Sequence, residues 1–374
     1  MRANILFIFF FLSSVFSWAQ QAYLSEDYKK FGLNPKKVEK WEDGTRTNGG
    51  EKNTYEWWYF DFKFSDGTIM VIDFLTKPVN KINTKASPFY FVDIVFADGS
   101  EYKKFWRYKK SDFRIAKDSC FISFGNSYVR GNLKEYHIHI EEEDFLLDLS
   151  LNNKSTSWRA KTGYLLFDSD KYFAWVVAVP EGIAKASFSI AGKQFNLNGY
   201  GYHDHNWGNY LMHKLMHHWH WSRTHFKNYT VIAASIVATK KYDYKNFTLF
   251  SVFKDGQLLF SDTDSSEFFE TEPKPVFPNK VMSDVLIFRH INKQTYYELE
   301  LRKKRITSIV RIIYSVIKFK PLAWLIEKIM GLSPVYYRMS GSAEFSIKSP
   351  NKPFIELKTD DAIWELMYFG NLVD

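Results

Sequence analysis

The chain repeats a pattern of two strand-like runs separated by a short turn that contains glycine. The pattern appears as TYEWWYFDFKF-SDG-TIMVIDFLT over residues 54–76, as FYFVDIVF-ADGS-EYKKFWRY over 89–108 and as FTLFSVF-KDGQ-LLF over 247–260. Aromatic and β-branched residues favour strands, and a glycine turn between two such runs is typical of a β-hairpin. Many short strands joined by turns predict an all-β fold of the barrel or sandwich type.

The length of the chain predicts two domains, because 374 residues exceed what one hydrophobic core usually spans. A hydrophobic content of 45% with 25% charged residues is typical of a globular protein rather than a disordered one. We expect a polar leader over 20–49, a first domain over 50–215 and a second over 216–374. The join then falls in a region rich in histidine and tryptophan, and binding sites often lie at domain interfaces.

The N-terminus has the pattern of a secretory signal peptide. Arg2 precedes an apolar run from Ile5 to Phe16, and Ser17-Trp18-Ala19 fits a small-x-small cleavage site. We expect cleavage after Ala19, which predicts a periplasmic or secreted mature protein. The alternative is an uncleaved membrane anchor, for which the apolar run is short. Cys120 is the only cysteine, so an internal disulfide is excluded.

Residues 302–332 depart from the strand pattern. Polar residues at 305, 308, 311, 315 and 318 have helical spacing, and Pro321 is expected to end or kink the helix. This predicts an amphipathic helical insertion over 303–332 in the second domain. Seven Lys/Arg and no acid lie between 302 and 320, so 303–320 is a candidate for binding an anionic membrane surface. The alternative is a helix that packs across a barrel mouth and exposes its basic side.

The net charge of +8 does not by itself identify a partner. We find no motif of a DNA- or RNA-binding fold, and nucleic acid is not an expected partner.

Two polar stretches, GYGYHDHNWG at 199–208 and HHWHW at 217–221, carry the candidate site. In a strand, alternate side chains share a face. One face of the first stretch would carry Tyr202, Asp204 and Asn206, and the other would carry His203, His205 and Trp207. In the second stretch Trp219, Trp221 and Arg223 would share a face.

Three interpretations of these residues remain open. His203 and His205 could bind a metal on one face of the strand, with His217 or His220 as a further ligand. Alternatively, a carboxyl in an aromatic pocket has a raised pKa and could protonate an alkene, while a histidine handles the attacking water. Third, the polar residues could be structural and satisfied by hydrogen bonds. In that interpretation Glu56 forms an ion pair with Arg223.

The motifs YEWWYFDF (55–62), GYGYHDHNWG (199–208), WHWSR (219–223), YTVIAAS (229–235) and AIWELMYFG (362–370) resemble the carotenoid 1,2-hydratase family. That family includes hydroxyneurosporene synthase and related lipocalin-like proteins. The resemblance implies two lipocalin-like antiparallel β-barrel domains packed together. It also implies a hydro-lyase that adds water to a C=C bond of an isoprenoid or carotenoid-like substrate, without a cofactor.

The resemblance further implies roles for individual residues. Asp204 would donate the proton, and His203 or His205 would handle the water. Substrate contacts and cation stabilisation would come from Tyr202, Asn206, Trp207, Trp219, Trp221 and Trp58. The alternatives are a periplasmic lipid-binding protein without catalysis, and a cyclase or pericyclase on the same scaffold.

Overall fold

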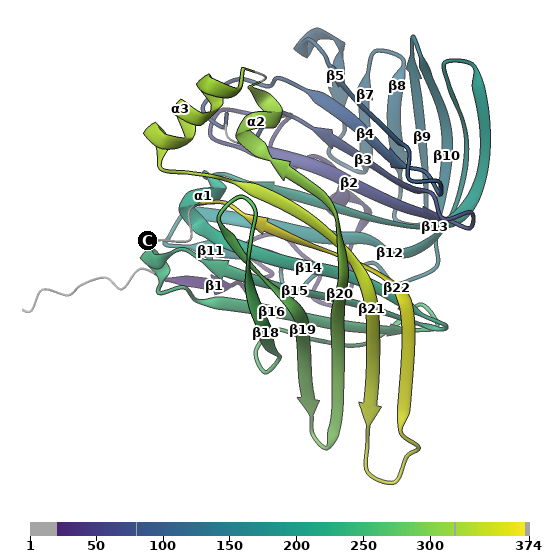
Figure 1. The fold of residues 1–374 in the computed structure, drawn as a ribbon, viewed down its shortest axis with the longest axis vertical. Helices are drawn as coiled ribbons and strands as arrows, with labels where there is room; N and C mark the ends of the chain where they lie inside the picture. Colours follow the sequence, from purple (N-terminus) through teal and green to yellow (C-terminus); the bar gives the residue numbers. More distant parts are fainter. Residues whose placement is uncertain (1–20, 80, 318, 371–374) are drawn as a thin grey trace, which may run out of the picture.

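The computed structural model describes residues 21–79, 81–317 and 319–370, and most of them belong to two antiparallel sheets (Figure 1). The predicted all-β class is confirmed. The first sheet contains β1–β13 and the second contains β14–β22, and the chain passes from one to the other between Gly208 and Met216. The predicted signal peptide, residues 1–19, lies outside the described residues.

The first sheet has the order β5-β4-β3-β2-β13-β12-β10-β9-β8-β7-β6, and β11 pairs with β1 and β12. Its strands are β1 (Ala22–Leu24), β2 (Tyr55–Phe64), β3 (Ile69–Leu75), β4 (Phe89–Val95), β5 (Glu101–Arg107), β6 (Phe113–Ile115), β7 (Cys120–Phe124), β8 (Ser127–Gly131), β9 (Glu135–Glu142), β10 (Phe145–Asn153), β11 (Tyr164–Phe167), β12 (Lys171–Ile190) and β13 (Lys193–Gly208). The sheet curls around a core to which β2 contributes alternate residues, among them Trp58, Phe60 and Phe62.

The second sheet has the order β17-β16-β15-β14-β22-β21-β20-β19-β18. Its strands are β14 (Met216–Phe226), β15 (Tyr229–Ala238), β16 (Asn246–Lys254), β17 (Gln257–Asp262), β18 (Glu267–Val276), β19 (Lys280–Asn292), β20 (Thr295–Arg311), β21 (Val335–Lys348) and β22 (Ile355–Tyr368). Its own core includes Phe250, Phe345 and Trp364.

The helical prediction for 303–332 is wrong over its first part. Residues 303–311 belong to β20, and the helices that follow are α2 (Ile312–Val316) and α3 (Lys320–Met330). The pairing of β20 with β21 shifts register twice, between Lys303 and Arg305 and between Ile306 and Ser308. Each bulge changes which residues share a face, so a bulged strand here has polar residues at helix-like intervals.

Pro321 begins α3 instead of ending a helix. A proline fits the first turn because the N–H groups there have no partner inside the helix. A further α-helix is the single turn α1 (Met212–Leu215), and no helix among the described residues is long and apolar enough to span a bilayer.

The leader segment is fixed to the first sheet by buried ionic contacts. The 3-10 helix η1 (Lys40–Asp43) carries Glu42, whose carboxylate lies 3.2 Å from Arg159 Nη1. The carboxylate of Glu56 accepts hydrogen bonds from the hydroxyls of Thr45 and Thr47 and lies 2.9 Å from His205 Nε2. Burial alone would raise the pKa of Glu56, but the hydrogen bonds from His205 and Thr47 hold it below its ordinary value.

Replacing Glu56 with Gln should lower the free energy of unfolding by about 3 kcal/mol or more, because a buried carboxylate that accepts hydrogen bonds from His205, Thr45 and Thr47 is lost. The matched control is Glu344→Gln, which removes a carboxylate from an exposed pair with Lys358 and should cost at most about 1 kcal/mol. Urea unfolding of both variants measures the difference. Equal stability losses would contradict a structural role for Glu56.

Candidate functional site

A pocket lies between the two sheets, where β2, β12 and β13 face β14, β15 and β22. Its cavity volume is about 90 Å³. The residues that line it are Trp57, Tyr59, Phe173, Trp175, Asp204, Asn206, Trp219, His220, Trp221, Ala234, Ile236 and Glu365. Ligand pockets usually have volumes of about 300 Å³ or more, so this one holds only part of a drug-sized molecule.

Strand register explains why these side chains meet. Across β12, β13 and β2, Trp175 pairs with Asn206, which pairs with Trp57. One row further on, Asp204 pairs with Tyr59. Directly opposed residues share a face, so two adjacent rows point toward the second sheet.

Asp204 is the buried acid of the pocket. Its Oδ2 accepts hydrogen bonds from Trp175 Nε1 at 2.9 Å and from the Tyr202 hydroxyl at 2.8 Å. Its Oδ1 accepts one from Asn206 Nδ2 at 2.6 Å. Burial raises the pKa of Asp204 to about 7, although the hydrogen bonds from Tyr202, Trp175 and Asn206 favour the carboxylate.

These contacts also determine where a proton resides on Asp204. Two donors already point at Oδ2, whereas Oδ1 accepts only from Asn206 among the described residues. Of the two oxygens, Oδ1 therefore has more room for the carboxyl proton. A carboxyl with a pKa near 7 is substantially protonated at neutral pH, and the donors stabilise the carboxylate that remains after it gives up its proton.

A second polar cluster borders the pocket from the other sheet. Oε1 of Glu365 accepts hydrogen bonds from the Tyr336 hydroxyl at 2.5 Å, from Arg338 Nη2 at 2.8 Å and from the Tyr59 hydroxyl at 3.2 Å. Arg338 Nη2 also donates to the Tyr59 hydroxyl at 2.8 Å. Tyr59 thus connects the Glu365–Arg338 pair of the second sheet to the strand that pairs with Asp204.

Asp73 is a third buried carboxyl, next to this cluster. It pairs with Tyr59 across β2 and β3, and its Oδ1 has no hydrogen-bond partner. Burial, and then the nearby carboxyls of Asp204 and Glu365, raise the pKa of Asp73 well above its ordinary value. Burial therefore favours the protonated form of Asp73, which limits the negative charge between the sheets.

The structure brings together only part of the predicted site. Asp204, Asn206, Trp219 and Trp221 line the pocket. Tyr202 reaches it through its hydroxyl, and its ring lies 5.1 Å from the ring of Trp221. The predicted face of Tyr202, Asp204 and Asn206 is confirmed. Arg338, Glu365 and Asp73 were not predicted.

The roles predicted for His203, His205, Trp207 and Trp58 are not supported, because these side chains lie on the opposite face of the first sheet from the pocket. His203 stacks on Phe60 at 3.9 Å, and His205 stacks on Trp58 at 4.5 Å. Trp207 lies 4.8 Å from the His205 ring. The alternation of β13 separates each of them from Asp204.

The two histidines instead hold the leader segment. His203 Nδ1 donates to the Tyr59 carbonyl, and its Nε2 lies 3.2 Å from both carboxylate oxygens of Asp43. His205 Nδ1 donates to the Glu42 carbonyl at 3.2 Å. Each ring therefore has an oxygen of the protein beside both of its nitrogens.

The predicted pair of Glu56 with Arg223 is also wrong. Arg223 Nη2 lies 2.5 Å from Asp61, whereas Glu56 points to the leader. Glu56 and Asp61 are five positions apart on β2, so they lie on opposite faces of the strand. Of these two carboxylates, only Asp61 lies on the face that points to the second sheet.

The predicted set of His203, His205 and His220 is not assembled. His220 belongs to β14, and its ring contacts Glu270, 3.1 Å from Nε2, and Phe268, at a ring distance of 5.2 Å. Among the described residues, one group of metal-ligand types does converge: atoms of Asp43, Cys120 and His203 lie within 4.8 Å of one another. Asp43 already accepts hydrogen bonds there from His203 and Tyr136.

Comparison with known proteins supports the fold. A family model described as Diels-Alderase-like matches residues 150–310. The solved structure of CghA with Sch210972 has 10% identity and a TM-score of 0.58, covering 85% of this chain and 89% of that one. No curated protein matches the sequence.

Two further solved structures share the fold. Kievitone hydratase from Nectria haematococca has 11% identity and a TM-score of 0.53, covering 89% of this chain and 94% of that one. A protein from Nitrosomonas europaea, provisionally described as AttH, has 14% identity and a TM-score of 0.55, covering 89% of this chain and 98% of that one. At these identities the likeness concerns the fold, which agrees with the predicted lipocalin-like barrels.

The Asp204 carboxyl should titrate near pH 7, and Tyr202→Phe should raise its pKa further, because one donor to the carboxylate is removed. NMR of ¹³C-labelled aspartate carboxyls measures both values. Asp204→Asn identifies the signal by deleting it. A carboxyl that titrates near pH 4 in the wild type, or a pKa that falls in Tyr202→Phe, would contradict the assignment.

Proposed function

We propose that this protein is a cofactor-independent enzyme that adds water across a C=C bond of an apolar, isoprenoid-like substrate. The observation that carries the proposal is the Asp204 carboxyl, which has a pKa of about 7 and lies in a pocket walled by tryptophans. An acid that is protonated at neutral pH in an apolar site can protonate an alkene. The likeness to a hydratase of the same fold supports hydration.

The reaction begins with proton transfer from Asp204. The O–H bond at Oδ1 breaks, the alkene π electrons form a C–H bond, and the adjacent carbon becomes a cation. Trp57, Trp219 and Trp221 line the pocket, and the face of an aromatic ring stabilises positive charge. The three hydrogen bonds to Asp204 stabilise its carboxylate at the same moment.

Water addition completes the reaction. Every hydrogen bond that Glu365 accepts within the described chain goes to Oε1, so Oε2 is available to a water. We assign Glu365 as the base: the water oxygen forms a C–O bond with the cation, and Oε2 takes the water proton. Loss of that proton to solvent and uptake of one by Asp204 restore both groups, and the net change is the addition of one water.

The pocket volume limits how the substrate binds. A cavity of about 90 Å³ holds the reacting double bond rather than a whole isoprenoid. The rest of the substrate must extend beyond the pocket between the sheets. The N-terminal sequence pattern supports a periplasmic or secreted location for this reaction.

A second candidate function is cyclisation of an apolar substrate in the same pocket. The observation that favours it is the Diels-Alderase-like family model, because its match over 150–310 includes Trp175, Asp204, Trp219 and Trp221. A cyclase product has the same mass as its substrate, whereas a hydratase product gains one water.

Asp204→Asn should lower turnover by about 10² or more, because amide nitrogen cannot replace a carboxylic acid as proton donor. The measurement is mass spectrometry of an apolar membrane extract before and after incubation with the mature protein. The matched control is Asp148→Asn, an exposed aspartate on β10, which should leave turnover unchanged.

Three results would overturn the hydration proposal. Full turnover by Asp204→Asn would remove Asp204 as the acid. A product of unchanged mass would favour the cyclase. An unmodified lipid bound equally by the wild type and Asp204→Asn, with no conversion, would identify a lipid-binding protein without catalysis.

A further inference from the structure

Helix α3 presents its apolar side to solvent. Leu322, Leu325 and Ile329 lie on one face at intervals of three and four residues, and their exposed fractions are 45%, 45% and 75%. The small residue Ala323 is the buried one. A surface helix usually turns its apolar face to the core, so the orientation of α3 is the reverse of the expected one.

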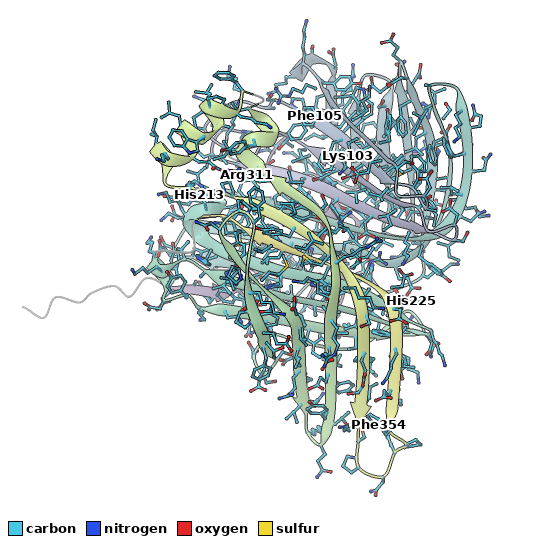
Figure 2. The ribbon with its side chains drawn as sticks, viewed as in Figure 1. Lys103, Phe105, His213, His225, Arg311 and Phe354 are labelled. Atoms are coloured by element: carbon cyan, nitrogen blue, oxygen red, sulfur yellow. The ribbon has the colours of Figure 1, made fainter. Side chains whose placement is uncertain are left out.

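The orientation is fixed by contacts on the polar side of the helix. Glu327 Oε2 accepts a hydrogen bond from Arg311 Nη2 at 2.6 Å, and its Oε1 accepts one from the Ser333 hydroxyl at 3.2 Å. Arg311 is the last residue of β20, at the base of the two helices (Figure 2). The apolar side therefore cannot turn inward without breaking the Arg311–Glu327 pair.

Two further aromatic residues extend the exposed surface. Phe319, directly before α3, is 68% exposed, and Phe277 in the β18–β19 turn is 65% exposed. The guanidinium of Arg311 lies 5.7 Å from the Phe277 ring, which places Phe277 beside the base of the helices. We name Phe277, Phe319, Leu322, Leu325 and Ile329 the apolar ridge.

The charges next to the apolar ridge are positive. Lys320 and Lys328 are exposed near the two ends of α3, and Lys328 Nζ lies 4.3 Å from the ring of exposed Trp324. The acid of α3, Glu327, is neutralised by Arg311. An apolar face flanked by lysine and tryptophan matches the boundary between lipid headgroups and acyl chains.

We propose that the apolar ridge docks this protein on the surface of an anionic lipid bilayer, with Lys320 and Lys328 at the headgroups. This surface differs from the one expected over 303–320. Two of the basic residues of β20 are already paired, Lys303 with Asp284 and Lys304 with Asp360, both at 2.7 Å. The lipid contact therefore shifts to α3 and its flanking phenylalanines.

A second copy of the chain fits this surface less well. A helix of 11 residues is about 16 Å long and about 10 Å wide, so it covers about 160 Å², whereas stable dimers bury about 800 Å² on each partner. Two copies that met face to face would also bring their lysines together. A bilayer can bury the apolar ridge among its lipids, and its anionic headgroups attract the lysines.

The ridge lies at the end of the strands that form the pocket wall. Trp219 of the pocket, on β14, pairs with Met367 on β22. The same row continues across β21 and β20, where Met367 pairs with Tyr336 and Tyr336 pairs with Val310. Helix α2 begins two residues after Val310, and Figure 1 shows α2 and α3 at that end of β20. For an apolar substrate, which rests on the proposed function, this arrangement places the pocket near the lipid that contains it.

The test is flotation with vesicles of phosphatidylcholine alone and of phosphatidylcholine with phosphatidylglycerol. We expect the wild type to bind the anionic vesicles, and Leu325→Ser/Ile329→Ser to bind them at least about 10-fold more weakly. The matched control is Leu258→Ser/Leu259→Ser on β17, which changes two leucines that are also exposed and should bind as the wild type does. Lys320→Glu/Lys328→Glu should bind anionic vesicles more weakly.

Three outcomes would overturn the proposal: no binding by the wild type, equal binding by the Leu325→Ser/Ile329→Ser variant, or a wild-type dimer that this variant abolishes. Asp204→Asn should bind vesicles like the wild type, because it alters only the pocket. Vesicle binding with no turnover would thus contradict the proposed reaction and leave the docking surface in place. Turnover without vesicle binding would contradict the docking surface and leave the proposed reaction in place.

Discussion

The pairing of β13 with β2 sets the chemistry of both faces of the first sheet. One strand carries His203 and His205 on the side of the barrel interior and Asp204 on the side of the second sheet. The register with β2 places Glu56 beside His205 and Tyr59 beside Asp204. A shift by a single residue would exchange these faces and bury the wrong groups in both places.

The two faces use buried charge in opposite ways. Around Glu56, donors from His205, Thr45 and Thr47 outweigh the cost of burial, and the carboxylate holds the leader in place. Around Asp204, three donors do not fully offset burial, and the carboxyl keeps a proton near neutral pH. The first environment is suited to stability and the second to proton donation. The motif that looks like one site in the sequence is therefore two sites in the structure.

The sequence predicted the features that depend on local pattern. Alternation predicted the hairpins and the shared face of Tyr202, Asp204 and Asn206. It could not predict Glu365 and Arg338, because they meet Tyr59 from strands about 300 residues away and no local period marks that contact. The error at 303–311 has another cause, since two bulges in β20 gave a strand the polar spacing of a helix.

The roles predicted for His203 and His205 find no support in the structure, although the prediction that both share the face opposite Asp204 is confirmed. In a regular strand, a histidine next to an aspartate in sequence points to the opposite face of the sheet, so adjacency in sequence argues against a shared pocket. Alternation along β13 places the two halves of the HDHNW motif on opposite faces, and the register with β2 gives each half its partners.

The central claim is that Asp204 transfers a proton to a carbon atom of the substrate. The most direct measurement is the reaction run in D₂O, followed by mass spectrometry and NMR of the isolated product. Since the Asp204 proton exchanges with solvent, the account predicts one carbon-bound deuterium in each product molecule. A product without carbon-bound deuterium would contradict it and indicate a reaction in which Asp204 only binds and orients the substrate.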